Sequence, residues 1–268
     1  MMQDLSTFIT TVYTHYAQHK RIFSWRENIT PYRVVVSEIM LQQTQTDRVK
    51  YKFEQWLNRF PNFESLAQAS TADVIVSWSG LGYNRRALAL HAIAQRVMLE
   101  YHGHLPDNPE VLVTFKGIGI NTAGSIGAFA FNKPTVFIET NIRAVYIHHF
   151  FPQEEKVHDK QLLPLIEATV DKFNAREWYY ALMDYGVILK KEQKNPSRKS
   201  AHYTVQSKFE GSERQIRGMI LRSLAEYGKL NLDDLTAIIP RDSRRIEKNL
   251  SDLISEGFVK NNNDHYYL

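Results

Sequence analysis

Hydrophobic residues recur at helical spacing through most of the first 190 residues, and this periodicity constrains the fold more than any other feature. The repeat at i, i+3 and i+4 predicts helices over 5–18, 32–50, 64–78, 86–101, 121–131, 141–151, 161–173 and 177–190. Short breaks rich in glycine, proline and asparagine separate these segments. No sustained β-type alternation occurs before residue 258. The sequence therefore predicts an all-α domain over residues 1–190.

The remaining chain divides into a linker and a small domain. Residues 191–212 lose the periodicity, and between Lys190 and Phe209 six lysines and arginines oppose one glutamate. Such a stretch suits a polyanionic partner, or it is simply a solvated linker. Residues 213–268 indicate three helices followed by a hairpin with its turn at 261–264. This order predicts a winged-helix-like domain; a helical packing module is the alternative.

Composition excludes several kinds of site. The chain has no cysteine, which excludes disulfides, thiolate metal sites and cysteine nucleophiles. It has no apolar run long enough for a membrane span, and its N-terminus lacks the charge pattern of a signal peptide. We therefore expect a cytoplasmic protein without a membrane partner.

The stretch LVTFKGIGINTAG, residues 112–124, places a tight turn between two helical segments. Gly117 and Gly119 flank Ile118, and Lys116 precedes them. Glycines allow close approach of the backbone to a ligand, and the free N–H groups at the start of the next helix can bind a phosphate. The pattern predicts a helix-hairpin-helix that contacts DNA phosphates; an ordinary turn between helices is the alternative.

The stretch SEIMLQQTQTDRV, residues 37–49, places Glu38 in an apolar segment. In a helix over 32–50, Glu38 would share a face with Val34, Val35 and Leu41. Burial there would raise the pKa of its carboxyl and let it donate a proton at neutral pH. The alternative, which spacing alone favours, is an ion pair with one of three arginines, Arg26, Arg33 or Arg48.

A second acid stands in VFIETNIRAV, residues 136–145. Glu139 lies between an apolar extended stretch and a helix that begins at Thr140 or Asn141. Displacement at a sugar C1′ requires two carboxyl groups, one to protonate the leaving group and one to stabilise the sugar cation or handle the water. Glu38 and Glu139 are therefore the candidate catalytic pair.

The motifs SEIMLQQTQ, GLGYNRRAL, FKGIGINTAG, IETNIRAV and ALMDYG, in this order, resemble those of the A/G-specific adenine DNA glycosylases (MutY type). These enzymes belong to the helix-hairpin-helix glycosylase superfamily. The resemblance implies a two-lobed, all-α fold that binds duplex DNA between its lobes and flips the target nucleotide into a pocket. It implies a nucleoid-associated monomer that hydrolyses the N-glycosidic bond of adenine mispaired with 8-oxoguanine or G.

The resemblance also assigns roles to individual residues. Glu38 matches the catalytic acid, which protonates adenine and activates the water. Gln43 and Thr44, next to Gln42, match residues that enter the base stack, and Tyr83 matches the aromatic wedge. The matched pocket residues are Arg26, Asn121 and Asn141, and the matched phosphate-binding hairpin contains Lys116, Gly117, Ile118 and Gly119. Apart from the resemblance, Arg85 and Arg86 either bind phosphate through bidentate contacts, which we favour, or are plain surface residues. The hairpin also admits a monovalent cation held by carbonyl oxygens.

Three departures from the family pattern modify these expectations. The family's second carboxylate is an aspartate, and here it is Glu139. The lysine of bifunctional members is Asn121, which predicts base removal without strand cleavage. The positions of the family's four cluster cysteines hold Lys190, Ser197, Ser200 and Gln206, so we expect no iron–sulfur cluster. The alternative functions are removal of T or U opposite G, and non-catalytic binding of damaged DNA.

Overall fold

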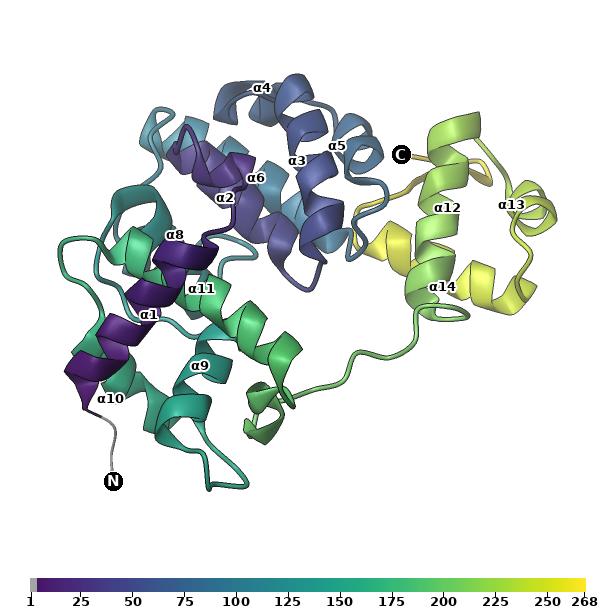
Figure 1. The fold of residues 1–268 in the computed structure, drawn as a ribbon. Coiled ribbons are helices and arrows are strands. Elements are labelled where there is room, and N and C mark those ends of the chain that lie inside the picture. The colour runs from purple at the N-terminus through teal and green to yellow at the C-terminus, as the bar shows by residue number, and fades with distance from the viewer. Residues whose placement is uncertain (1–3) are drawn as a thin grey trace. The chain divides into compact units, whose positions relative to one another are not determined.

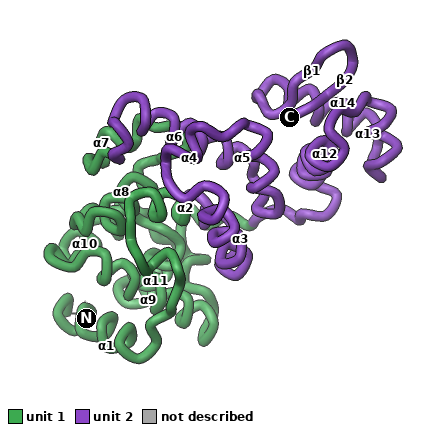
Figure 2. Tube along the Cα trace, turned by 90° about the horizontal axis from the view of Figure 1, so that it is seen from above, with its two compact units in different colours: residues 1–38, 106–205 green, residues 39–105, 206–268 purple. Residues whose placement is uncertain are grey.

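A computed structural model of the chain describes residues 4–268, which form two compact units. Unit 1 contains residues 1–38 and 106–205, and unit 2 contains residues 39–105 and 206–268 (Figure 2). Each unit is therefore built from two separate stretches of chain. Throughout residues 4–268, no helix is both long enough and apolar enough to cross a membrane.

Helices dominate the described residues, which confirms the all-α expectation. Unit 1 contains α1 (Leu5–His19), η1 (Ser24–Arg26), most of α2 (Pro31–Leu41), α7 (Pro109–Leu112), α8 (Ile120–Phe131), α9 (Thr140–Phe150), α10 (Asp159–Thr169), α11 (Ala175–Glu192) and η2 (Pro196–Lys199). Unit 2 contains α3 (Thr46–Arg59), α4 (Phe63–Gln68), α5 (Thr71–Trp78), α6 (Arg85–Tyr101), α12 (Glu213–Tyr227), α13 (Leu232–Ile238), α14 (Ser243–Ser255), β1 (Lys260–Asn262) and β2 (His265–Tyr267).

The core of unit 1 forms around α11, which packs against α9, α1 and α8 (Figure 1). Aromatic side chains fill the space between these helices. The ring of Phe8 lies 5.1 Å from that of Tyr146 and 6.0 Å from that of Trp178, and all three are fully buried. Burial of large apolar surfaces of this kind is the main driving force that holds the α-helices together. The result is a rigid support for α8 and α9, which carry site residues.

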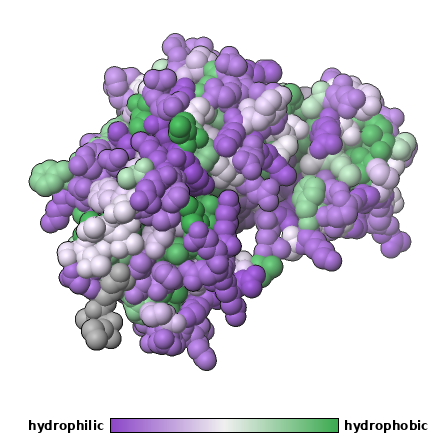
Figure 3. Space-filling view, viewed as in Figure 1, coloured by the Kyte–Doolittle hydropathy of each residue, from purple (hydrophilic) through white to green (hydrophobic). Residues whose placement is uncertain are grey.

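In unit 2, α5 packs against α6, α3 and α12. We call residues 206–268 the C-terminal module; it contains α12, α13, α14 and the hairpin. Its apolar core, which includes Ile220 and Leu224, extends to Ile75 of α5. The hairpin pairs Lys260 with Tyr267 and turns at residues 263 and 264, which both have positive φ, as in the predicted hairpin. The visible face of the molecule is mostly hydrophilic (Figure 3).

The single helix expected over 32–50 is wrong, because the chain forms two helices there. α2 ends at Leu41 and α3 begins at Thr46, and Gln43 between them adopts a left-handed φ of 55°. The amphipathic pattern continues across this break, so periodicity alone did not reveal it. The segment 64–78 is likewise divided, because Ser70 caps the start of α5 through its side chain.

Candidate active site

Glu38 lies near the C-terminal end of α2, with its carboxyl group against α8. The hydroxyl of Ser125 donates a hydrogen bond of 2.5 Å to Glu38 Oε2. Burial is the main cause that raises the pKa of Glu38 to about 7; the hydrogen bond from Ser125 opposes this shift, and the negative charge of Glu139 contributes to it. Among the described residues Glu38 forms no ion pair, so the arginine alternative is not realised. The carboxyl therefore holds a proton near neutral pH.

Glu139 is the N-cap of α9, and its side chain satisfies the free N–H groups at the helix start. Its Oε1 accepts hydrogen bonds from the backbone N–H of Asn141 at 2.8 Å and of Ile142 at 3.2 Å, and its Oε2 accepts one from the Asn141 side chain at 3.3 Å. Caps are usually short residues, yet this longer side chain folds back to make both backbone bonds. The carboxylate is therefore fixed in one orientation.

The two carboxyl groups belong to the same neighbourhood of unit 1, since the charge of Glu139 acts on the pKa of Glu38. Asn121, in the first turn of α8, helps to place them. Its Oδ1 accepts a hydrogen bond of 3.1 Å from the backbone N–H of Ile138, the residue before Glu139. Asn121 thus connects the helix that carries Ser125 to the segment that carries Glu139.

Arg26 lies in the same unit and forms a buried ion pair. Its guanidinium donates two hydrogen bonds to Asp184, at 2.9 and 3.0 Å, and lies 4.3 Å from the centre of the Tyr180 ring. Arg21 binds the same carboxylate at 2.7 Å. Asp184 is fully buried, and its two arginine partners compensate its charge. Arg26 contributes a fixed positive charge, which lowers the pKa of Glu38 slightly against the larger effect of burial.

The glycine turn lies between α7 and α8, as the helix-hairpin-helix pattern predicts. Gly117 has a φ of 84°, which favours glycine, and Ile118 anchors the turn in the core with 4% of its surface exposed. Gly119 is the N-cap of α8 and provides no side chain to bond the first N–H groups. Lys116 is exposed beside this helix start. The turn therefore presents backbone donors and a cation on the surface.

In unit 2, two loops carry the residues matched to base-stack insertion. Gln43 has a φ of 55° and Tyr83 a φ of 47°, both in the left-handed region that non-glycine residues rarely occupy. The side chain of Gln43 is exposed and that of Tyr83 is partly buried. Strained backbone of this kind persists only where surrounding contacts enforce it, and it concentrates at functional sites.

Arg86 supplies those contacts, which differs from the phosphate contact that the sequence favoured. Its guanidinium is buried and donates to the carbonyl oxygen of Gln42 at 2.6 Å, the hydroxyl of Thr44 at 2.9 Å and the carbonyl oxygen of Gly82 at 3.0 Å. It also binds the carbonyl oxygens at the end of α2. Arg86 therefore joins the Gln42–Thr44 loop to the Tyr83 loop, and its guanidinium is enclosed by protein acceptors.

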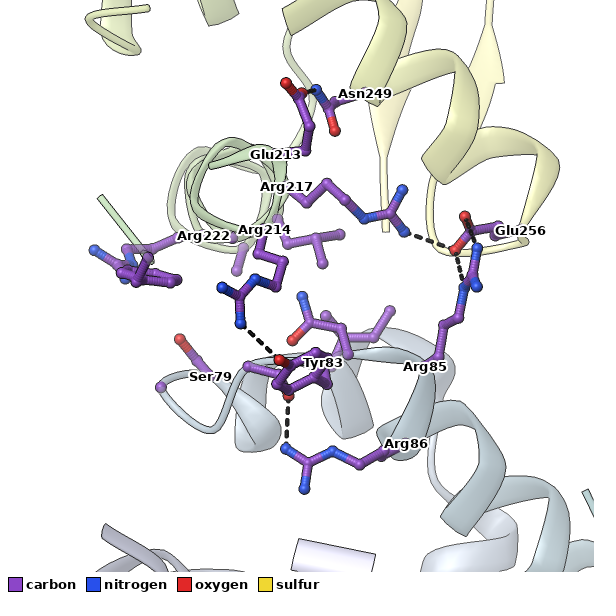
Figure 4. Close-up of a pocket in the computed structure, with 18 of the residues that line it drawn as sticks. Ser79, Tyr83, Arg85, Arg86, Glu213, Arg214, Arg217, Arg222, Asn249 and Glu256 are labelled. Atoms are coloured by element: carbon purple, nitrogen blue, oxygen red, sulfur yellow. Dashed lines mark hydrogen bonds and ion pairs between the residues drawn. The ribbon is translucent and has the colours of Figure 1, made fainter. Parts of the chain in front are cut away.

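Arg85 is exposed, but it forms a two-bond ion pair within unit 2. Its Nε lies 2.9 Å from Glu256 Oε2 and its Nη2 lies 2.5 Å from Glu256 Oε1. Arg217 of α12 binds the same carboxylate at 2.6 Å (Figure 4). Sequence spacing did not indicate this pair, because Arg85 and Glu256 are 171 positions apart.

The four positions that match cluster cysteines do not fit an iron–sulfur cluster. None supplies a thiolate, and two of the hydroxyls already bond to protein: Ser197 donates to Asn195 at 2.7 Å, and Ser200 accepts from the backbone N–H of His202 at 3.1 Å. Backbone bonds hold this segment instead, from Val157 N–H to Lys199 and from Ala201 N–H to Val157, each of 2.8 Å.

The chain is similar in sequence to known DNA repair proteins. Residues 36–167 match the HhH-GPD superfamily of base excision DNA repair proteins. The adenine DNA glycosylase of Mycobacterium tuberculosis is 30% identical over 91% of this chain and 89% of its own length. The adenine DNA glycosylase of Mycolicibacterium smegmatis is 26% identical over 93% of this chain and 91% of its own length. The adenine DNA glycosylase of Rattus norvegicus is 36% identical over 52% of this chain and 29% of its own.

Solved structures share the fold. A thermostable thymine-DNA glycosylase matches 72% of this chain and 90% of its own with a TM-score of 0.62 and 24% identity. An endonuclease III in a non-covalent DNA complex matches 68% of this chain and 85% of its own chain, with a TM-score of 0.57 and 11% identity. At these identities the likeness concerns the backbone arrangement alone.

Proposed function

Since this chain belongs to the adenine DNA glycosylases of the HhH-GPD superfamily, we propose that it removes mispaired adenine from duplex DNA by hydrolysis of the N-glycosidic bond. The observation that carries this proposal is the pair formed by Glu38 and Glu139 in unit 1. One carboxyl has a pKa raised to about 7, and the other is fixed by three hydrogen bonds. This is the division of labour that cleavage at an anomeric carbon requires.

In the first step, neutral Glu38 donates its proton to a ring nitrogen of adenine. The C1′–N9 bond then breaks, adenine leaves with the bond's electron pair, and positive charge develops on the sugar. The hydrogen bond from Ser125 stabilises the carboxylate that Glu38 becomes. Ser125 therefore supports the proton transfer without itself reacting.

In the second step, Glu139 stabilises the sugar cation while a water molecule attacks C1′. Glu38, now a carboxylate, accepts a proton from this water and returns to its neutral form. The products are free adenine and an abasic sugar, and the enzyme is regenerated. Because Glu139 is held by the start of α9, its charge needs little reorganisation as the cation forms.

The proposed reaction leaves the DNA strand intact. Strand cleavage by this superfamily's bifunctional members uses a lysine amine, and the matching position is Asn121, whose side chain bonds to Ile138. In this proposal, the start of α8 binds a DNA phosphate, and the glycine turn before it can hold a monovalent cation. Gln43, Thr44 and Tyr83 enter the opened base stack. The enzyme would act as a monomer on nucleoid DNA containing A opposite 8-oxoguanine or G.

The test is base release under single-turnover conditions on a set of duplexes. The set contains A opposite 8-oxoguanine, G or C, and T or U opposite G, and each reaction is divided and analysed with and without alkali. We expect release from the adenine mispairs, strand breaks only after alkali, and no release by Glu38→Gln.

Release of T or U in place of adenine would contradict the proposed substrate while keeping the carboxylate mechanism. Tight DNA binding without release from any duplex would contradict the enzymatic proposal altogether. Binding measurements alone do not separate these outcomes, because every DNA-binding protein has salt-dependent affinity.

A further inference from the structure

The C-terminal module holds the side chain of Tyr83. Arg214 of α12 donates a hydrogen bond of 2.6 Å from Nη1 to the Tyr83 hydroxyl (Figure 4). The side-chain amide of Gln206 donates to the same oxygen. Both donors and Tyr83 belong to unit 2. Tyr83, the residue matched to the aromatic wedge, is thus held by the C-terminal module, and its two hydrogen-bond donors lie more than 120 positions later in the sequence.

The ring of Tyr83 is fixed from two sides. The guanidinium carbon of Arg214 lies 5.3 Å from the ring centre and that of Arg86 lies 5.6 Å from it, within the range of cation–π contacts. Arg214 is itself anchored, since its Nη2 donates to the carbonyl oxygen of Ser207 at 2.8 Å and to the Ser207 hydroxyl at 3.1 Å. Together with the left-handed φ of Tyr83, these contacts leave the side chain one orientation.

These contacts line a cavity of about 1050 Å³ in unit 2. Gln42, Gln43 and Tyr83 form one wall, and Arg214 and Arg217 of α12 contribute to the other. Tyr83 therefore stands beside the loop matched to base-stack insertion, with open space next to it, while its far end is held by the module.

We propose that Arg214 is a positioning residue that holds Tyr83 in the orientation needed to enter the base stack, so that duplex opening depends on the C-terminal module. This inference rests on the proposed function for the identity of the wedge. Its physical basis is preorganisation: a side chain that is already ordered loses less conformational freedom when it inserts. Arg214 itself acts through Tyr83 and does not touch the reacting atoms.

The experiment is a double-mutant cycle of Arg214→Met and Tyr83→Phe. The phenylalanine keeps the ring and removes the hydroxyl that both Arg214 and Gln206 bind. Duplex opening is measured by the fluorescence of 2-aminopurine placed beside an A opposite 8-oxoguanine, in the Glu38→Gln background and at saturating protein. Base release is measured separately with Glu38 intact.

We expect each single variant to release adenine about tenfold more slowly, the change that corresponds to one lost charge-assisted hydrogen bond, and to give a smaller fluorescence rise. The double variant should lose less than the sum of the two single losses, because both variants remove the same hydrogen bond between Arg214 and the Tyr83 hydroxyl. Arg214→Lys, which retains a donor, should recover part of both signals.

Two control variants separate positioning from attachment of the module. Glu256→Gln weakens a different polar contact between the module and α6, the ion pair of Glu256 with Arg85, and leaves Tyr83 unchanged. Arg222→Met removes an arginine of the same helix and the same cavity that, among residues 4–268, forms no hydrogen bond with Tyr83. Both should keep the wild-type fluorescence rise at saturation.

Additive effects in the cycle, a wild-type signal in Arg214→Met, or an equal loss in Glu256→Gln would overturn the inference. Adenine release by wild-type protein together with any of these results would leave the proposed function standing. Duplex opening that depends on Arg214 without release of any base would do the opposite, keeping the positioning role and ending the proposed reaction.

Discussion

At the scale of single residues, the chemistry depends on how the protein surrounds two glutamates that the sequence places in unlike settings. Glu38 is in a helix and is partly buried, and its desolvation favours the neutral form of the carboxyl. Glu139 is at a helix start and accepts N–H bonds, which favour a fixed carboxylate. The different surroundings of the two acids support the different roles that we propose for them.

Glu38 should give the enzyme a specific pH dependence. Its folded-state pKa of about 7 exceeds the usual 4.5, so between these values the folded protein holds a proton that the unfolded chain has lost. The free energy of unfolding should therefore fall as pH rises through this window, by at most about 3 kcal/mol. Adenine release should likewise decline above pH 7. Urea unfolding of wild type and Glu38→Gln at pH 5 and pH 8 checks the effect on stability. If the free energies of unfolding of the two proteins differ by the same amount at both pH values, the prediction is contradicted.

Glu139 should tolerate shortening better than loss of charge. Asp at this position can still cap α9 and carries the same charge, so Glu139→Asp should keep adenine release within about tenfold of wild type. Glu139→Gln keeps the length but removes the charge that stabilises the sugar cation, and should slow release about 100-fold or more. Single-turnover rates check both variants. A Glu139→Gln enzyme as fast as wild type would exclude the carboxylate from the reaction.

At the scale of elements, the site depends on close contact between α11 and the start of α9. Gly186 of α11 lies against Asn141, and a Cβ atom added there would be 2.5 Å from the Asn141 carbonyl oxygen. Asn141 is the residue whose N–H groups hold Glu139. Because Gly186 has no side chain, α11 can pack directly against the backbone of Asn141, which orients the Glu139 carboxylate.

Gly186→Ala should therefore displace the start of α9. We expect adenine release to fall about 100-fold, since shifts near 1 Å at reacting groups have effects of that size, and the free energy of unfolding to fall by about 2 kcal/mol. Gly218→Ala in α12 is the matched control, because an added Cβ there meets nothing within 4 Å. It should be neutral or slightly stabilising. Urea unfolding and single-turnover rates of both variants test this prediction. If Gly186→Ala and Gly218→Ala have the same free energy of unfolding and the same rate of adenine release, the packing argument is refuted.

At the scale of the whole molecule, the segment that matches the family's cluster loop holds its shape through protein contacts. Lys199 donates from Nζ to the carbonyl oxygen of Pro152 at 2.7 Å, and a short parallel bridge joins Val157 to Ser200. The η2 turn packs against α9. Backbone bonds therefore provide the fixation that metal–sulfur bonds provide in cluster proteins.

The purified protein should accordingly fold and act without iron. We expect no iron by elemental analysis, no visible absorbance from a cluster, and unchanged adenine release after treatment with a chelator. Reconstitution with iron and sulfide is the complementary measurement and should bind no stoichiometric cluster. A stoichiometric iron content with loss of activity on chelation would contradict this expectation.

The sequence by itself determined the helical class and the glycine turn before α8. These features depend on local spacing, so a single stretch of chain carries the whole signal. The family motifs extended this to Tyr83 and the QQT loop. The sequence did not determine the break at residues 42–45, because the polar contacts that fix it come from Arg86, more than 40 positions away.

Only the tertiary structure decided how the site residues are held. The hydroxyl of Ser125 reaches Glu38 across 87 positions, and Arg214 reaches Tyr83 across 131. Arg86 was expected at phosphate and instead lies inside, because its donors meet the carbonyl oxygens of two loops. Most of these contacts join groups that lie more than 40 positions apart, so no local periodicity reveals them. Folding alone brings such partners together, since packing of distant elements and not local spacing sets which polar groups meet.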